Sequence, residues 1–172
     1  MFGVQFQIEN NFIFSNQIFN IMIQKVGQEH CQPRKKHEFR SRSYHSLHFV
    51  IYGRGELLIN EEKIFLKKGD VFLLYAGEKY EYYPSSSDPW SYIWIDFFGD
   101  NIEELFSACG FKKEKPYIDV QDFPWYVDFL KQLYQVYDGS TLSLLSCSGY
   151  FAVLLSHLIS MHKIRKGRLG EE

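Results

Sequence analysis

From Ile18 to Phe98 the sequence consists of short apolar or alternating segments separated by turn residues. The segments that read as strands are Ile18–Val26, Tyr44–Tyr52, Gly55–Ile59, Lys63–Leu66, Asp70–Tyr75, Tyr80–Tyr83 and Ser91–Phe98. The intervening stretches, among them Gly53-Arg54-Gly55 and the run from Pro84 to Pro89, are rich in residues that favour turns. Many short strands at regular spacing predict an all-β sandwich or barrel.

After Gly99 the apolar period changes from two to about 3.6 residues, which predicts helices. The first helix can begin at Asp100, with Glu103 in a capping-box pattern, and end at Gly110. The second can begin at Asp122, followed by Pro124, and end at Gly139. The third runs from about Leu142 to Ile164. We therefore expect a barrel with an N-terminal arm over residues 1–99 and a helical part of the same domain over residues 100–168.

Composition narrows the class of protein. The net charge of -2 argues against a surface that neutralises nucleic-acid phosphates, so this chain alone should not bind DNA. Cys31, Cys109 and Cys147 form no CxxC pair, which favours a reducing cytosol over a disulfide framework. No apolar run approaches the roughly 20 residues of a membrane helix, so we expect neither secretion nor membrane insertion. A small core does not need an aromatic content of 18%, which suits a surface that stacks on a ligand; a β-rich core is the alternative.

The motifs of common enzymes are missing from the sequence. Ser85, Ser86 and Ser87 lie in a polar turn without a G-x-S-x-G elbow, and Gly53-Arg54-Gly55 joins two strands instead of opening a helix around a phosphate. We expect no catalytic residues.

Three segments resemble the strand-and-turn scaffold of the cupin superfamily. They are Gly53–Glu56, Leu66–Phe72 and Tyr75–Tyr80. In catalytic cupins this scaffold holds a metal through a His-x-His pair, a Glu and a later His. Here His45 and His48 are three residues apart, so a regular strand places them on opposite faces. Tyr80 stands at the position of the later His, and only one His together with Glu56 remains. We therefore expect no metal and no cofactor.

A more specific resemblance is to the N-terminal domains of the AraC family of sugar-responsive transcription regulators, in the branch that controls oligosaccharide operons of low-GC bacteria. It rests on the blocks Arg42–Gly55, Lys68–Leu73 and Asp88–Gly99 in this order, and above all on the run Asp-Pro-Trp-x-Tyr-x-Trp in the last block. The resemblance spans about Ile18 to Ile164. It implies a cupin-like (jelly-roll) β-barrel followed by about three helices.

The strand Ser91–Phe98 carries the candidate ligand site. Alternation places Trp90, Tyr92, Trp94 and Asp96 on one face, where rings and hydrogen-bonding groups suit a sugar. The two tryptophans could instead simply fill the barrel. Carried over by position, the resemblance implies that Arg42, Tyr82, Tyr92 and Trp94 bind the ligand. Arg40 is an alternative to Arg42, and the arm from Met1 to Gln17 would be a lid.

The third predicted helix has two apolar stripes, whereas a helix packed on a barrel needs one. The first is a heptad-like seam of Leu144, Cys147, Phe151, Leu154, Leu158 and Met161. The second contains Leu145, Ala152, Leu155 and Ile159. We predict a homodimer through Leu144, Phe151, Leu154, Leu158 and Met161, with either stripe open as the outer one. The alternative is a helix buried between the barrel and the second helix.

Members of the resembling family carry two helix-turn-helix motifs after the third helix, whereas this sequence ends at Arg168-Leu169-Gly170-Glu171-Glu172. We therefore expect the effector-binding and dimerising part of a cytoplasmic regulator of carbohydrate use, with a sugar as ligand and with DNA contacted only through a domain absent from this chain. Two alternatives stay open. One is a small metal-dependent cupin enzyme acting on a sugar or small metabolite, and the other is a dimerisation module whose barrel is filled by its own aromatic residues.

Overall fold

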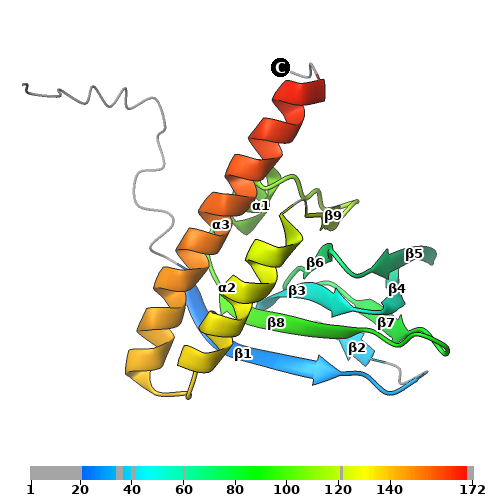
Figure 1. Cartoon of the computed structure of the whole chain (residues 1–172), viewed down its shortest axis with the longest axis horizontal. Coiled ribbons are helices and arrows are strands. Elements are labelled where there is room, and N and C mark those ends of the chain that lie inside the picture. The colour runs from blue at the N-terminus through cyan, green and yellow to red at the C-terminus, as the bar shows by residue number, and fades with distance from the viewer. Residues whose placement is uncertain (1–20, 34–36, 40–41, 60, 121, 170–172) are drawn as a thin grey trace, which may run out of the picture.

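Figure 1 shows the computed structural model of the chain, which describes residues 21–33, 37–39, 42–59, 61–120 and 122–169. The strands are β1 (Met22–His30), β2 (His37–Phe39), β3 (His45–Tyr52), β4 (Arg54–Ile59), β5 (Glu62–Lys67), β6 (Asp70–Leu74), β7 (Tyr80–Pro84), β8 (Ser91–Phe98) and β9 (Tyr117–Asp119). The helices are α1 (Ile102–Ala108), α2 (Phe123–Val136) and α3 (Thr141–Leu169).

The strands form two antiparallel sheets. Sheet A has the order β1-β8-β3-β6-β9, and sheet B has the order β2-β7-β4-β5. The first eight strands are divided between the sheets as in an eight-stranded jelly roll, with most connections crossing from one sheet to the other. The helices lie beside sheet A, as Figure 1 shows. The expected cupin-like jelly-roll barrel followed by three helices is therefore confirmed.

Two apolar clusters share the interior, one on each face of sheet A. Ile93, Ile95 and Phe97 of β8 belong to the cluster between sheet A and the helices. Trp90 and Tyr92 belong to the cluster between the two sheets, and Trp94 packs against it. The alternation predicted for this strand is confirmed, and it makes sheet A the middle layer of the molecule.

The boundaries of several elements differ from the prediction. β1 runs four residues beyond Val26, to His30, and residues 18–20 of the predicted strand lie outside the described part. The short strands β2 and β9 had no pattern long enough to predict them. The capping box at Asp100 is wrong, because α1 begins after Asn101, which takes a left-handed conformation with φ of 53° and makes no side-chain cap. α3 continues past Ile164 because its basic end consists largely of good helix formers.

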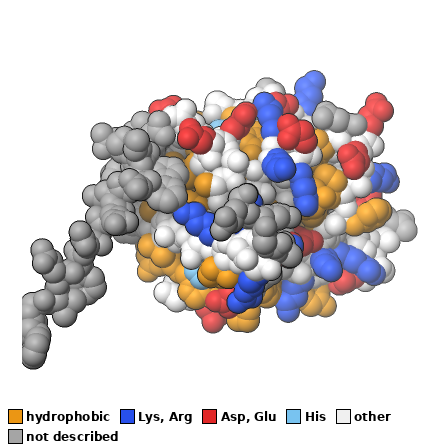
Figure 2. Space-filling model, turned by 90° about the horizontal axis from the view of Figure 1, so that it is seen from above, with side chains coloured by type: hydrophobic (Ala, Val, Ile, Leu, Met, Phe, Trp, Pro, Cys, Tyr) orange, Lys and Arg blue, Asp and Glu red, His pale blue; other side chains and the backbone are white. Residues whose placement is uncertain are grey.

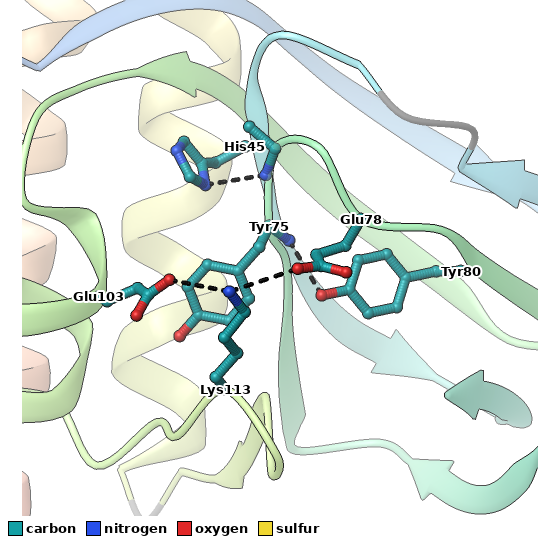
Figure 3. A network of polar contacts seen from close by, with 7 residues as sticks. His45, Tyr75, Glu78, Tyr80, Glu103 and Lys113 are labelled. Atoms are coloured by element: carbon teal, nitrogen blue, oxygen red, sulfur yellow. Dashed lines mark hydrogen bonds and ion pairs between the residues drawn. The ribbon is translucent and has the colours of Figure 1, made fainter. Parts of the chain in front are cut away.

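A polar network ties the barrel to α1 on the helical side of sheet A (Figure 3). Lys113 donates to Glu103 of α1 at 3.2 Å and forms an ion pair with Glu78 at 3.3 Å. The backbone N–H of Ala76 donates to Nδ1 of His45 at 3.1 Å, and that of Tyr75 donates to the hydroxyl of Tyr80 at 3.3 Å. The exposed ion pairs contribute little alone, whereas the bond to His45 satisfies a half-buried backbone group.

The first apolar stripe of α3 is part of the core and does not form an outer surface. Phe151, Leu154 and Leu158 have exposed fractions of 1%, 0% and 2% and belong to the cluster under sheet A. Leu144 and Met161 are partly buried on the same side. The predicted dimer seam is corrected accordingly: its central residues are already covered by the same chain, because the helix needs this face to pack on the sheet.

Of the second predicted stripe only Leu145 is exposed, because Leu155 is 2% exposed and Ala152 and Ile159 are partly buried. The outer face of α3 nevertheless exposes several apolar side chains. Leu142, Leu145 and Val153 are exposed by 74%, 72% and 52%, and Ile164 by 44%. By length and composition alone α3 could cross a membrane, whereas the sequence predicted no apolar segment of that length. Its packing against the sheet is typical of the core helix of a globular domain. On the face in Figure 2, side chains of both charges lie interspersed among apolar ones.

The contact of His45 predicts a pH dependence of stability. Burial lowers the pKa of its imidazole from the usual 6.5, while the charge of Glu103 opposes this shift more weakly. The unfolded chain therefore binds more protons than the fold below about pH 6.5, and the free energy of unfolding falls as the pH drops through this value toward the lower pKa of the fold.

We expect His45→Asn to reduce this loss, because the amide oxygen can accept the bond from Ala76 without titrating. The free energy of unfolding of wild type and variant is measured by urea denaturation at a series of pH values between about 7.5 and 5. The matched control is His30→Asn on the barrel surface. The pKa of His157 is also lowered by burial, and its contribution to the pH dependence of stability is the same in all three proteins. An identical pH profile of the His45 variant and wild type would contradict the expectation.

Candidate functional site

A pocket of about 380 Å³ opens between the two sheets at one end of the barrel. All four residues predicted to bind the ligand, Arg42, Tyr82, Tyr92 and Trp94, line this pocket. The other lining residues are Gln24, Lys25, Glu29, Tyr44, Ser46, His48 and Asp96. Every one of these side chains carries a hydrogen-bonding atom, so the pocket is a polar site with one large aromatic surface.

Alternation on β3 and β8 decides which side chains reach the pocket. Tyr92, Trp94 and Asp96 point inward from β8, and Ser46 and His48 do so from β3. His48 stacks on Phe72 with ring centroids 4.5 Å apart. His45 lies on the other face of the sheet against Phe97, at a centroid distance of 5.5 Å. The prediction that the two histidines face opposite sides is confirmed.

A bulge in β1 adds two polar residues to the pocket. The register between β1 and β8 shifts between Ile23 and Lys25, so that Gln24 has no partner of its own. Ile23 and Val26 both face the helices although they are three residues apart, while Gln24 and Lys25 line the pocket. A bulge commonly redirects side chains in this way.

The indole of Trp94 lies flat across β1 at its cross-strand neighbour Gly27. A Cβ atom built on Gly27 would lie only 2.2 Å from Cζ2 of Trp94 and 2.4 Å from Cη2. Glycine is therefore required at this position if the ring is to keep its place. The indole is partly exposed, and Tyr92 supports it edge-on at a centroid distance of 6.0 Å.

Two of the three tyrosines in the pocket, Tyr82 and Tyr92, are held in the neutral, hydrogen-bonding form. The hydroxyl of Tyr92 donates to Oε2 of Glu29 at 3.0 Å. Burial raises the pKa of both Tyr82 and Tyr92 well above the usual value of 10.0. Both hydroxyls stay protonated at any physiological pH, so each can donate one hydrogen bond and accept others.

Charged groups of both signs complete the site. Ser46 donates to Oδ1 of Asp96 at 2.5 Å. Burial raises the pKa of the Asp96 carboxyl, while the bond from Ser46 and the charges of Arg42 and Lys25 oppose this rise. Arg42 donates to the hydroxyl of Tyr44 and its guanidinium lies 5.3 Å from the centre of that ring. The pocket can therefore offer hydroxyl-bearing ligands both charged donors and charged acceptors.

Several site residues were not predicted from the sequence. Glu29, Lys25 and Gln24 lie on β1, whose register and bulge no local pattern reveals. Asp96 had been placed on the correct face but not assigned to the ligand. The role of Gly27 depends entirely on its cross-strand neighbour. Arg40 and the arm from Met1 to Gln17 lie outside the described residues.

The residues considered for a metal cage lie apart. Glu56 is on the outer face of sheet B, where it pairs with Lys63 at 3.2 Å, whereas His48 is inside the barrel. Within the described ranges, no three His, Cys, Asp or Glu side chains converge as metal ligands would.

Comparison with known proteins gives a consistent assignment. The family model described as the AraC-like ligand binding domain matches residues 23–147. The Msm operon regulatory protein of Streptococcus mutans is 34% identical over 106 residues, which cover 62% of this chain and 37% of that protein. The raffinose operon transcriptional regulatory protein RafR of Pediococcus pentosaceus is 32% identical over 125 residues, covering 71% and 45%.

The chain thus spans less than half the length of these relatives. Among solved structures, an apo ToxT variant from Vibrio cholerae aligns with a TM-score of 0.52 at 11% identity, over 81% of this chain and 55% of that one. At this identity the likeness concerns the fold alone, and it extends beyond the barrel into the helices.

The close approach of Gly27 and Trp94 predicts a specific effect of Gly27→Ala. The added methyl group must displace the indole, and overpacking of this kind costs about 1–3 kcal/mol of stability. We expect lower stability together with a shifted tryptophan emission spectrum. The matched control is Gly149→Ala in α3, where a Cβ meets nothing within 4 Å and where alanine is favoured by about 0.5–1 kcal/mol. If Gly27→Ala left both stability and emission unchanged, the described position of Trp94 would be wrong.

Proposed function

The chain belongs to the family of AraC-like ligand binding domains, and from this premise we propose that it is the effector-binding domain of a transcription regulator of carbohydrate use, with one sugar bound in the pocket against Trp94. The observation that carries the proposal is the composition of the pocket: one partly exposed indole among side chains that all offer hydrogen-bonding atoms. Its relatives from Streptococcus mutans and Pediococcus pentosaceus are named as operon regulators.

A sugar ring suits both properties of this pocket. The C–H groups on one face of the ring stack on the free face of Trp94, whose other face is covered by β1 at Gly27. The hydroxyls replace the existing partners of Arg42, Tyr92 and Asp96, and the planar guanidinium can bind two of them at once. Because Tyr92 and Asp96 are buried, an analogue that lacks a hydroxyl leaves one of them unpaired and binds more weakly.

The size of the pocket limits the ligand. Its volume of about 380 Å³ lies near the lower end of the roughly 300–1,000 Å³ that small-molecule sites occupy. One sugar ring, or the terminal ring of an oligosaccharide with the rest outside, fits this space. In this proposal the domain binds and releases its ligand unchanged, as a sensor and not as an enzyme. The regulator acts in the cytoplasm. In such a regulator a separate helix-turn-helix domain contacts DNA.

The outer face of α3 is the proposed homodimer surface. Leu145 and Val153 lie on this face and are exposed by 72% and 52%. Burying them against the same residues of a second copy is favourable by the hydrophobic effect, and a two-fold symmetric pair brings identical faces together. This assignment replaces the seam that packs on the sheet.

Sugar binding is tested first by thermal shift with raffinose and a panel of mono- and oligosaccharides, because a ligand that binds only the folded state raises the melting temperature. With the sugar that binds, Trp94→Ala is expected to lose about 2 kcal/mol or more of binding free energy in calorimetry. Trp125→Ala on α2, outside the pocket, is the matched control and should retain wild-type affinity. Unchanged affinity of a folded Trp94→Ala protein would refute the site.

Dimerisation is tested by sedimentation of Leu145→Glu/Val153→Glu, which should give a folded monomer because two carboxylates cannot be buried in an apolar interface. Phe65→Glu places the same type of change on an equally exposed residue of sheet B, 74% against 72%, and should leave the dimer intact. A wild-type chain that sediments as a monomer at high concentration would exclude this interface.

A further inference from the structure

The outer face of sheet B carries a second and larger groove. It has a volume of about 810 Å³ and is lined from β4, β5, β7 and the turn after β7. The helices lie beside sheet A, at the other side of the molecule from β5 (Figure 1). Phe65, at the centre of β5, has an exposed fraction of 74%. A large aromatic side chain on a bare sheet face is a feature that the sugar site does not explain.

The edge of sheet B beside this groove is open. Among the described strands β5 pairs only with β4, whereas the corresponding strand of sheet A, β6, is paired with β9 on its outer side. An open edge offers unpaired backbone groups to another strand.

The register of the β4–β5 hairpin shows which backbone groups are offered. Lys68 N–H donates to the carbonyl of Gly53 at 2.9 Å. Because hydrogen-bonded and non-hydrogen-bonded pairs alternate in an antiparallel ladder, the backbone groups of Lys63, Phe65 and Lys67 point away from β4. The Lys67 N–H has this direction, since it donates away from β4 to Oδ2 of Asp70 at 2.7 Å. Lys63 and Phe65 therefore present both N–H and C=O at the edge.

The side chains of the same three residues face the groove. Lys63, Phe65 and Lys67 alternate with the buried Ile64 and Leu66. The groove lining also includes Arg54 and one carboxylate, Glu56, so its cations outnumber its anions by three to one. The ion pairs Lys63–Glu56 at 3.2 Å and Arg54–Asp88 at 3.8 Å are exposed, and such pairs exchange partners at little cost.

We propose that the β5 edge binds an extended acidic segment of another protein as an additional strand of sheet B. The segment pairs with the backbone of Lys63 and Phe65, places an apolar side chain against Phe65, and places carboxylates two residues to either side against Lys63 and Lys67. Main-chain bonds give affinity in this mode of recognition, and the alternate side chains give specificity.

Charge complementarity favours an acidic partner over a second copy of this chain. Two β5 edges paired antiparallel about Phe65 would set Lys63 of each copy opposite Lys67 of the other, and like charges directly opposite destabilise a strand pair. Lysine on an edge strand is a common protection against self-association. The same lysines attract a strand that carries Glu at these positions.

The test uses the peptide acetyl-Thr-Glu-Thr-Tyr-Thr-Glu-Thr-amide, whose Glu-Tyr-Glu face matches Lys63, Phe65 and Lys67. Added to the isotope-labelled full chain, it should give saturable NMR shifts centred on the Lys63 and Phe65 amides and slow their hydrogen exchange. The peptide with both Glu replaced by Lys should bind at least about tenfold more weakly. Added salt should lower the affinity of the acidic peptide.

The protein variant Lys63→Glu/Lys67→Glu should likewise lose about tenfold or more in affinity. Its matched control, Lys112→Glu/Lys166→Glu, changes the net charge equally at exposed positions away from β5 and should bind as wild type. Equal binding of acidic and basic peptides, or no saturable shift with the acidic one, would overturn the proposal. Concentration-dependent protection of Lys63 and Phe65 in the protein alone would show that a second copy occupies the edge and would overturn it as well.

Discussion

The burial of β8 on both faces is the constraint on which the rest of the structure depends. Its alternate residues Ile93, Ile95 and Phe97 pack under the helices, while Tyr92, Trp94 and Asp96 point between the sheets. A shift of one residue in its register would exchange these two sets. The helical layer would then meet polar groups, and the barrel would lose its pocket. The same strand therefore specifies both the packing of the domain and the chemistry of its site.

The interior between the sheets changes character along the barrel. At one end Trp90, with an exposed fraction of 0%, stacks on Phe72 at 5.7 Å, and both contact Tyr82. At the other end several polar side chains of the pocket are hydrogen-bonded to one another, as Tyr92 is to Glu29 and Ser46 is to Asp96. Such pairing lowers the free-energy cost of burying polar groups. The buried, stacked rings at the aromatic end form the back wall of the pocket and pack against the binding residues Tyr82 and Tyr92.

Local pattern was sufficient to predict most of the strands and helices, because long strands with one apolar face show a clear period of two. The jelly-roll arrangement of the strands followed from the family resemblance. The face of β8 and the separation of His45 from His48 followed from period-two alternation alone. What local pattern could not supply is pairing between distant segments. The three-residue strands β2 and β9 are too short to show a period, and the contribution of Glu29 depends on its position opposite Tyr92. The two stripes of α3 were visible, but the fold covers the first and also Leu155 of the second, so neither predicted stripe is the outer face.

β1 is the element that the pocket and the helical layer have in common. Its inward residues Lys25, Gly27 and Glu29 contact or line the pocket, and its outward residues Ile23 and Val26 belong to the cluster that includes α3. A ligand can act on a distant surface only through a difference in its affinity for two arrangements of the protein. In this fold, a displacement of β1 would change the contacts on both of its faces. Gly27 lies in close contact with Trp94 on one face, and Ile23 and Val26 pack in the apolar cluster with α3 on the other. The bulge at Gln24 is the place along β1 where the ladder with β8 is already interrupted, so it is where the strand can adjust with the smallest loss of hydrogen bonds.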